Sequence, residues 1–407
     1  MKLLICLLLQ LVLIKATAQP AAAPTNVFII TTDGLRWQEV FNGADDRILK
    51  NPLFVKDTLL TNEMYGGASA EEKRKKLMPF FWSTLARQGQ LHGNRAYNNK
   101  VDVSNFYKIS YPGYNEILTG YADPLLMENK PILNKNTNLL EYLNTRESYK
   151  GSVVAFSSWD VFPFIINEER SKITVNSGYE NMTEQAASFK MINKVQDSVH
   201  QKTGTRYDQL TFLNAKEYLQ KYHPKIMMLG LGETDEFGHQ KKYDLYLQQA
   251  NNVDKMIAEL WYFAQTDSFY KGNTIFIIST DHGRGSNPGK WHTHGFLNKG
   301  ASETWLAMIG PGIKQLGEIK NDNQIYQKQL AATIAQLINQ KFEANHPIAT
   351  AFKLPSSATD QKSGGSNFSF VNNSLLPPLK MQLVLVLAAI LLLLGLIKQK
   401  TTGLLQQ

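Results

Sequence analysis

Seven residues spread along the chain have the types needed for a catalytic centre built on divalent cations: Asp33, Ser110, Asp235, His239, Asp281, His282 and His294. Carboxylates and imidazoles are the ligands that borderline cations such as zinc accept, so the six Asp and His side chains have the chemistry to hold a pair of ions. The serine adds a hydroxyl that a cation-binding function alone would not require. Together these residues fit a two-metal site for phosphoryl or sulfuryl transfer.

Short apolar runs precede three of the acidic residues. Val27 to Thr32 leads to Asp33, Ile226 to Gly232 leads to the segment with Asp235, and Thr274 to Thr280 leads to Asp281. The runs are apolar at consecutive positions, which is typical of strands covered on both faces. We therefore predict an α/β fold with a mostly parallel central sheet flanked by helices, whose strand ends bring these residues to one edge.

The spacing of the candidate ligands is compatible with shared ions. Asp235 and His239 are four residues apart, so a single helical turn would direct both side chains to one ion. Asp281 and His282 are adjacent and would point to opposite faces of an extended strand. At a strand-to-loop junction the chain can bend, which would let both reach metal.

Ser110 lies in the segment Lys108-Ile109-Ser110-Tyr111-Pro112-Gly113-Tyr114. Pro112 and Gly113 predict a turn, and residues 115–120 predict a following helix whose first amides would face an anion. A serine hydroxyl next to a divalent ion loses its proton near neutral pH and becomes a nucleophile without a histidine base. The alternative is that Ser110 merely begins a turn.

Five motifs carry a resemblance to a known superfamily: Thr31-Thr32-Asp33-Gly34-Leu35-Arg36, Ser110-Tyr111-Pro112 ending in Leu118-Thr119-Gly120, Glu233-Thr234-Asp235-Glu236-Phe237-Gly238-His239, Thr280-Asp281-His282-Gly283 and His294-Gly295. From about residue 26 to about residue 340 the chain resembles the alkaline phosphatase superfamily, with the type I phosphodiesterase/nucleotide pyrophosphatase branch closest in spacing. The resemblance implies an alkaline-phosphatase-like sandwich with a small cap insertion. It also implies a hydrolase of small-molecule phosphate esters.

The resemblance also implies roles for single residues. Asp235, His239 and His294 would hold one divalent ion, and Asp33, Asp281 and His282 the other, with zinc as the expected metal. Ser110 would bridge to the second ion as the nucleophile. His294 is preferred to His292 because the family pattern is a histidine followed by glycine. Asn129 resembles the family asparagine that binds a nonbridging phosphate oxygen.

The nucleophile segment separates this chain from related families. Sulfatases of the superfamily place an arginine where this chain has Tyr114, and they oxidise a Cys or Ser to formylglycine. The only cysteine, Cys6, lies near the N-terminus. An unmodified serine attacking phosphorus is therefore favoured, while a sulfatase, a phosphomutase and an inactive zinc-binding protein remain as alternatives.

Both ends of the chain carry apolar segments that predict export and anchoring. Residues 1–18 match a signal peptide, and Met381 to Ile397 is a 17-residue apolar run followed by Lys398 and Lys400. The run approaches the length of a membrane-spanning helix. We predict a catalytic domain over 19–350, a flexible linker over 351–380, a transmembrane helix over 381–397 and a cytoplasmic tail over 398–407. The catalytic domain would then lie on the extracytoplasmic side.

The sequence is less informative about the substrate. The formal net charge of +8 favours anionic substrates or an anionic membrane surface, and no basic-aromatic pattern predicts nucleic-acid binding. Trp159 and Phe162 have the chemistry to stack on a base or sugar, and Arg170 and Lys108 to neutralise phosphate. The alternative is that the two aromatic residues belong to a hydrophobic cluster and the two basic residues are solvated surface charges.

Overall fold

The structure is a computed structural model and describes residues 25–355. The predicted signal peptide, the transmembrane helix over 381–397, the cytoplasmic tail and most of the linker lie outside the described residues. At the start of the predicted linker, Phe352 is buried and its amide donates to Thr333 Oγ1 over 3.2 Å. Residues 351–355 therefore pack onto the catalytic domain.

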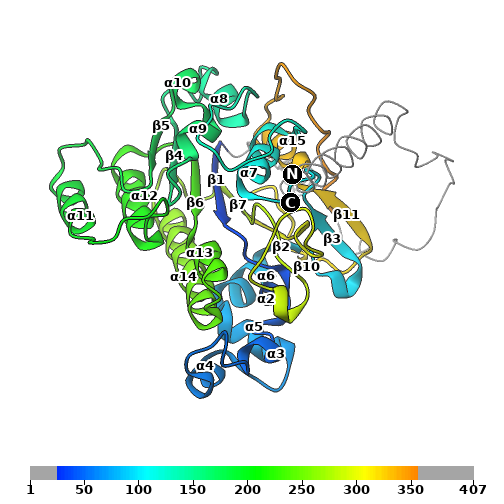
Figure 1. Cartoon of the computed structure of the whole chain (residues 1–407). Coiled ribbons are helices and arrows are strands. Elements are labelled where there is room, and N and C mark those ends of the chain that lie inside the picture. The colour runs from blue at the N-terminus through cyan, green and yellow to red at the C-terminus, as the bar shows by residue number, and fades with distance from the viewer. Residues whose placement is uncertain (1–24, 356–407) are drawn as a thin grey trace, which may run out of the picture. The chain divides into compact units, whose positions relative to one another are not determined.

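A large sheet forms the centre of the fold (Figure 1). Its strand order is β10-β2-β9-β7-β1-β6-β4-β5, and β7, β1, β6, β4 and β5 run parallel, while β9 is antiparallel to both of its neighbours. This matches the predicted mostly parallel sheet. The strands are β1 (Asn26–Thr32), β2 (Gly89–His92), β4 (Val153–Ser157), β5 (Thr174–Ser177), β6 (Ile226–Leu231), β7 (Thr274–Ser279), β9 (Leu306–Ile309) and β10 (Gly317–Glu318).

A smaller three-stranded sheet has the strand order β11-β3-β8. It consists of β3 (Asn99–Asp102), β8 (Glu303–Thr304) and β11 (Asn323–Tyr326). The α-helices are α2 (Trp37–Asn42), α3 (Asp46–Leu49), α4 (Thr58–Tyr65), α5 (Ala70–Leu77), α6 (Ala86–Gln88), α7 (Ser110–Thr119), α8 (Leu139–Asn144), α9 (Phe162–Ile166), α10 (Glu168–Ser171), α11 (Ala187–Asp197), α12 (Asp208–Tyr222), α13 (Glu233–His239), α14 (Tyr243–Thr266) and α15 (Leu330–Leu337). Short 3₁₀ or π turns are η1 (Phe81–Leu85), η2 (Arg95–Tyr97), η3 (Pro288–Lys290) and η4 (Gln327–Gln329).

Successive residues of the central strands enter two different cores, as the unbroken apolar runs predict. In β1, Phe28 and Ile30 pack in one core with residues of α12 and α14, whereas Val27 and Ile29 pack in the other with residues of α7, α8, α9 and α15. Helices therefore cover both faces of the sheet. Because both cores are fully apolar, the sheet holds β1, β6 and β7 in a fixed register.

The segments outside the sheet join the same compact unit, so the predicted small cap does not form a separate one among the described residues. The largest insertions are the helices between β1 and β2 and the segment with α11, which projects from the β5 side of the sheet (Figure 1). Within residues 25–355, no helix is both long and apolar enough to cross a bilayer.

Candidate metal and nucleophile site

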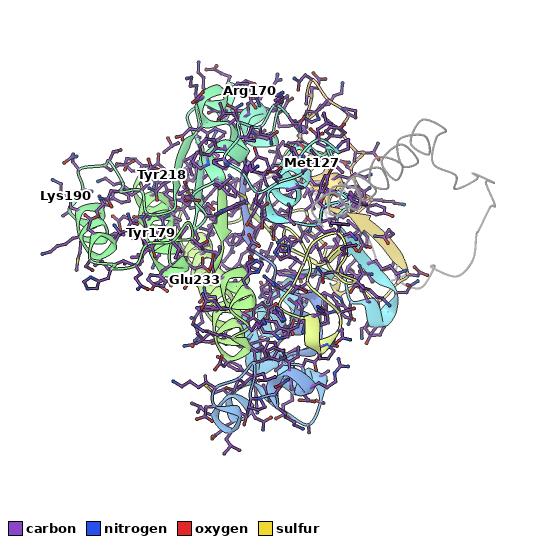
Figure 2. All side chains as sticks on the ribbon, in the orientation of Figure 1. Met127, Arg170, Tyr179, Lys190, Tyr218 and Glu233 are labelled. Carbon is purple, nitrogen blue, oxygen red and sulfur yellow. The ribbon has the colours of Figure 1, made fainter. Side chains whose placement is uncertain are left out.

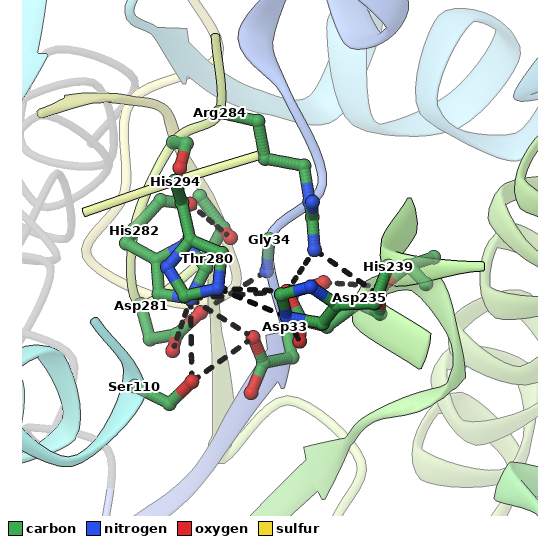
Figure 3. Close-up of polar contacts among 12 residues, drawn as sticks. Asp33, Gly34, Ser110, Asp235, His239, Thr280, Asp281, His282, Arg284 and His294 are labelled. Carbon is green, nitrogen blue, oxygen red and sulfur yellow. Dashed lines mark hydrogen bonds and ion pairs between the residues drawn. The ribbon is translucent and has the colours of Figure 1, made fainter. Parts of the chain in front are cut away.

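The carboxyl ends of β1, β6 and β7 meet at one edge of the sheet and carry the candidate ligands. Thr31 of β1 pairs with Gly230 of β6 and with Ser279 of β7, so the three strands end side by side. Asp33 follows β1 directly, α13 follows β6, and Asp281 follows β7. Figure 3 shows the side chains from these strand ends converging with Ser110 of α7 and His294.

Asp33, Asp281 and His282 form a buried set that we name the inner ligand group. One atom of each lies within 4.8 Å of one atom of each of the others. His282 Nε2 is 3.3 Å from Asp33 Oδ1 and 3.6 Å from Asp281 Oδ2. The Gly34 amide donates to Asp281 Oδ1 over 3.1 Å, which leaves Oδ2 directed at the imidazole.

Asp235, His239 and His294 form what we name the outer ligand group. His239 Nε2 lies 2.9 Å from Asp235 Oδ2 and 3.1 Å from His294 Nε2, and His294 Nε2 lies 3.7 Å from Asp235 Oδ1. Asp235 and His239 sit one turn apart on α13, as their spacing predicts. His282 is close to both groups, because its ring stacks on that of His294 with 4.0 Å between centroids and its Nε2 is 3.9 Å from Asp235 Oδ1.

The arrangement of these atoms fits divalent cations. Asp281 Oδ2 is buried without a hydrogen-bond partner, a costly state for a carboxylate oxygen. The ring nitrogens of His239 and His294 face each other across 3.1 Å, where at least one lone pair must be directed at the other residue. A cation held by Asp281 would give its unpartnered oxygen a ligand bond, and the N/O donor set suits zinc.

The carboxylates of the two groups differ electrostatically. Burial, followed by repulsion from Asp281 and Asp235, raises the pKa of Asp33 well above its ordinary value. Burial and Asp235 raise the pKa of Asp281 to about 7. The pKa of Asp235 is instead held well below its ordinary value: burial raises it, but Arg284 and the neighbouring histidines outweigh the burial. Burial and the proximity of His282 lower the pKa of His294, which keeps its ring neutral and able to bind a cation.

Ser110 lies at the inner ligand group. Its Oγ is 3.2 Å from His282 Nε2 and 3.5 Å from Asp33 Oδ1, and the side chain is buried. The predicted turn at Pro112 and Gly113 is wrong, because α7 already begins at Ser110 and contains both residues. Proline is tolerated in the first helical turn, where its missing N–H has no intrahelical partner to lose.

Gly113 explains how α7 approaches the ligands so closely. A Cβ atom at this position would lie 2.3 Å from the carbonyl oxygen of Asp281. Only glycine lets the helix pack directly on the backbone between the end of β7 and His282. The Pro-Gly pair therefore positions the nucleophile through close packing of a helix.

Asn129 lies beside the nucleophile. Its Oδ1 accepts a 2.9 Å hydrogen bond from the amide of Tyr111, the residue after Ser110. Because a backbone N–H needs an acceptor, this bond sets the orientation of the side-chain amide and leaves its NH₂ group to face elsewhere. The structure thus brings the candidate phosphate-binding residue to the start of α7.

The remaining sequence candidates lie in other surroundings. The carbonyl of Lys108 faces His294 Nδ1 at 3.3 Å, and its Nζ donates to the Phe296 carbonyl over 3.4 Å. Phe162 is fully buried in the core, so it is not available to stack on a substrate. The ring of His292 packs near Phe54, with 6.0 Å between centroids.

Arg170 has a structural environment. It lies in α10, which contacts α8 (Figure 1 and Figure 2), and its guanidinium pairs with Glu141 over 2.6 Å and donates to the carbonyls of Asn134 and Asn136. These contacts occupy the groups that would otherwise bind phosphate. The interpretation of Arg170 as a structural residue is therefore favoured.

The sequence analysis missed Arg284 and Thr234. The guanidinium of Arg284 contacts Asp235, and Thr234 Oγ1 donates to the carbonyl of Asp33 while lying 3.0 Å from Thr32 Oγ1. Thr234 lies inside the motif of residues 233–239, and Arg284 directly follows the motif of residues 280–283. A basic residue two positions after His282 was the available signal for Arg284, but sequence alone does not give its direction.

Comparison with known proteins agrees with this geometry. The family model of type I phosphodiesterase / nucleotide pyrophosphatase matches residues 42–359. No curated protein matches the sequence. Among solved structures, wild-type alkaline phosphatase PafA is similar with a TM-score of 0.54 and 11% identity, over 82% of this chain and 99% of that chain. The lipoteichoic acid synthase LtaP from Listeria monocytogenes has a TM-score of 0.49 at 11% identity over 79% and 73% of the chains, and the 2-O GAG sulfatase BT1596 a TM-score of 0.49 at 13% over 79% and 72%.

The family match defines a metal-dependent hydrolase of phosphate esters, and the fold is similar to that of an alkaline phosphatase. The chain belongs to the type I phosphodiesterase / nucleotide pyrophosphatase family. The likeness to PafA, at 11% identity, concerns the fold alone.

Proposed function

We propose that this protein is an exported, membrane-tethered two-metal hydrolase that cleaves phosphate esters through a phosphoserine on Ser110. The observation that carries the proposal is the position of Ser110 Oγ at the first residue of α7, 3.2 Å from His282 Nε2 and 3.5 Å from Asp33 Oδ1. A hydroxyl buried among candidate ligands has no role in binding cations alone. It is placed to attack a substrate held at the same edge.

The two ligand groups would hold one divalent ion each, with zinc as the expected metal. When bound, the ions would neutralise the negative charge of the phosphate and lower the pKa of the Ser110 hydroxyl. The N/O donor set supports this assignment: Asp33, Asp281 and His282 lie close enough to share one ion, as do Asp235, His282 and His294. His239 Nε2 lies 2.9 Å from Asp235 Oδ2 and adds a donor to the outer ligand group.

In the first step, Ser110 Oγ would give up its proton and attack phosphorus, a new O–P bond would form, and the bond to the leaving oxygen would break as that oxygen takes up a proton and departs as the alcohol. The NH₂ group of Asn129, whose orientation is set by the Tyr111 amide, is positioned to donate to a nonbridging oxygen. In the second step, water would attack phosphorus on the side opposite Ser110, the Oγ–P bond would break, and a proton from the water would restore the Ser110 hydroxyl. Burial of Ser110 limits competing water during the first step.

The surroundings of Tyr114 favour phosphate over sulfate chemistry. Tyr114 occupies the place of the sulfatase arginine, and it is buried with its ring 5.0 Å from that of Phe162 and its hydroxyl 3.4 Å from Thr31 Oγ1. It therefore belongs to the core beneath the site and supplies no positive charge. A formylglycine at Ser110 would lack this supporting cation.

Export and anchoring are supported by the apolar segments at residues 1–18 and 381–397. Protease treatment of intact cells, followed by detection of the catalytic domain and the tail with separate antibodies, tests the topology. Loss of the catalytic domain only is expected if it lies outside. Protection of both parts would contradict the proposed localisation.

The activity is tested on the full-length protein in detergent with p-nitrophenyl phosphate, bis-p-nitrophenyl phosphate and p-nitrophenyl sulfate. Phosphate ester cleavage that disappears with EDTA and returns with zinc is expected. Acid quenching during turnover should trap phosphate on the peptide that contains Ser110. Faster cleavage of the sulfate, or no cleavage of any ester with zinc restored, would contradict the proposal.

A further inference from the structure

Arg284 joins three parts of the site although it follows His282 by only two residues. Its side chain is fully buried, and its Nη2 forms an ion pair with Asp235 Oδ1 and donates to the Asp235 carbonyl over 3.1 Å. Its Nη1 donates to the carbonyl of His292 over 2.5 Å. Figure 3 shows the Arg284 side chain directed at Asp235.

Two glycines make room for this side chain. A Cβ atom at Gly238 would lie 2.6 Å from Arg284 Cζ and 2.8 Å from both Nη atoms, and a Cβ at Gly34 would lie 2.8 Å from Nε. Gly238 is inside α13 and has no positive φ, so backbone conformation does not require glycine there. The guanidinium does require glycine at position 238, since any side chain there would displace the guanidinium.

The contacts of Arg284 favour one ligand group over the other. With Oδ1 of Asp235 held by the guanidinium, Oδ2 is left facing His239 Nε2 at 2.9 Å. The His292 carbonyl belongs to the loop that carries His294, so the same guanidinium also fixes that loop. Within the described residues, no hydrogen bond joins Arg284 to a side chain of the inner ligand group.

We propose that Arg284 is a positioning residue for the outer ligand group, which orients Asp235 and the His294 loop so that they bind a divalent ion together with His239. This inference rests on the proposed two-metal centre and adds a residue to it. Arginine suits the task because its planar fork contacts a carboxylate oxygen and two carbonyls at once. A lysine ammonium offers a single charged point and would keep only part of these contacts.

The test measures metal binding directly. Full-length wild-type protein, Arg284→Met and Arg284→Lys are dialysed against buffered free zinc and their metal content is determined by mass spectrometry. The wild type is expected to hold two ions. Arg284→Met should keep one ion and bind the other about 10- to 100-fold more weakly, the usual range for supporting residues, and Arg284→Lys should lie between. Cobalt absorption spectra should show one unchanged and one altered site.

A double-mutant cycle separates positioning from general destabilisation. In the wild-type background, Gly238→Ala should weaken binding of the ion at the outer ligand group, because its methyl group displaces the guanidinium. In the Arg284→Met background it should have no further effect, because the guanidinium is absent. Arg206→Met is the matched control. Arg206 is equally buried but binds neutral partners, Thr211 and Asn176 among them, so its loss should lower the melting temperature and leave two ions bound.

Each result decides between clear alternatives. Two ions bound with unchanged affinity in a folded Arg284→Met protein would overturn the inference while leaving the two-metal centre intact. Equal weakening of both ions, or the same loss in Arg206→Met, would assign Arg284 a general structural role and also overturn it. Absence of metal from the wild type would remove the two-metal centre and this inference with it.

Discussion

The two ligand groups contain similar side chains but balance their charges in different ways. The inner ligand group lies at the ends of β1 and β7, is almost fully buried, and has two carboxylates with raised pKa values. Within residues 25–355, no arginine forms an ion pair with either carboxylate. The outer ligand group lies on α13 and a loop, includes the half-exposed His239, and has Arg284 against its carboxylate. The inner ligand group therefore depends on a cation for neutrality, whereas the outer ligand group has part of the compensating positive charge built into the protein.

The largest expected effect is that of Ser110→Ala, which removes the nucleophile at the inner ligand group. Turnover should fall on the order of 10^4-fold or more, as for other nucleophile deletions. Both groups should still bind metal, because six other side chains supply the ligands. Rates on bis-p-nitrophenyl phosphate and metal content measure the two effects. Loss of metal in parallel with activity would mean that Ser110 acts mainly as a ligand.

Ligand substitutions should next separate the groups. Asp281→Asn and His239→Gln are each expected to lower turnover about 10^3-fold, since an ion supplies several kcal/mol to the transition state. Excess zinc should rescue His239→Gln better, because the outer ligand group is less buried than the inner one and keeps Asp235 and His294. Zinc titration of activity measures the rescue. Equal rescue of both variants would remove the distinction between the groups.

Without metal, the inner ligand group should make stability depend on pH. The pKa of Asp281 is about 7 in the folded protein and about 3.9 in an unfolded chain, so folding favours its protonated form. This stabilisation is present below the unfolded pKa and is lost as pH rises through the folded value, at a cost of up to about 4 kcal/mol. In EDTA, the melting temperature should therefore be higher at pH 5 than at pH 8, and Asp281→Asn should reduce the difference. A difference that Asp281→Asn leaves unchanged would place its origin in other groups.

The smallest effect on catalysis is expected for Arg170→Met, far from both groups. The ion pair with Glu141 and the bonds to two carbonyls should be lost, with about 2 kcal/mol of stability. Turnover and KM should stay within about twofold, because these contacts are structural. Thermal unfolding and steady-state kinetics check both parts. A large rise in KM would restore Arg170 as a substrate-binding residue.

Sequence alone predicted the elements that carry an unbroken apolar signal. The runs at Val27, Ile226 and Thr274 became β1, β6 and β7 with ends within a residue of expectation, and the four-residue spacing of Asp235 and His239 became one turn of α13. These predictions hold because burial on both faces leaves a pattern in consecutive residues.

What sequence missed depends on contacts between distant segments. Pro112 and Gly113 have the composition of a turn, but the close approach of Asp281 requires glycine inside a helix. Phe162 and Arg170 have side chains suited to a binding site. However, Phe162 is buried in the core, and the guanidinium of Arg170 donates to the Asn134 carbonyl. The direction of the Arg284 side chain has no local sequence signal. The glycines that accommodate it, Gly238 and Gly34, lie some 50 and 250 positions earlier in the chain.

The placement of β1 between β6 and β7 has a consequence for how the protein folds. Val27 pairs with Ile226 on one side and with Ile275 on the other, so the first strand pairs only with strands that lie some two hundred residues later in the chain. Such distant pairings close slowly. The cation ligands can come together only after these strands have paired. Metal should therefore bind late in folding and stabilise a nearly native structure, and it should not nucleate folding.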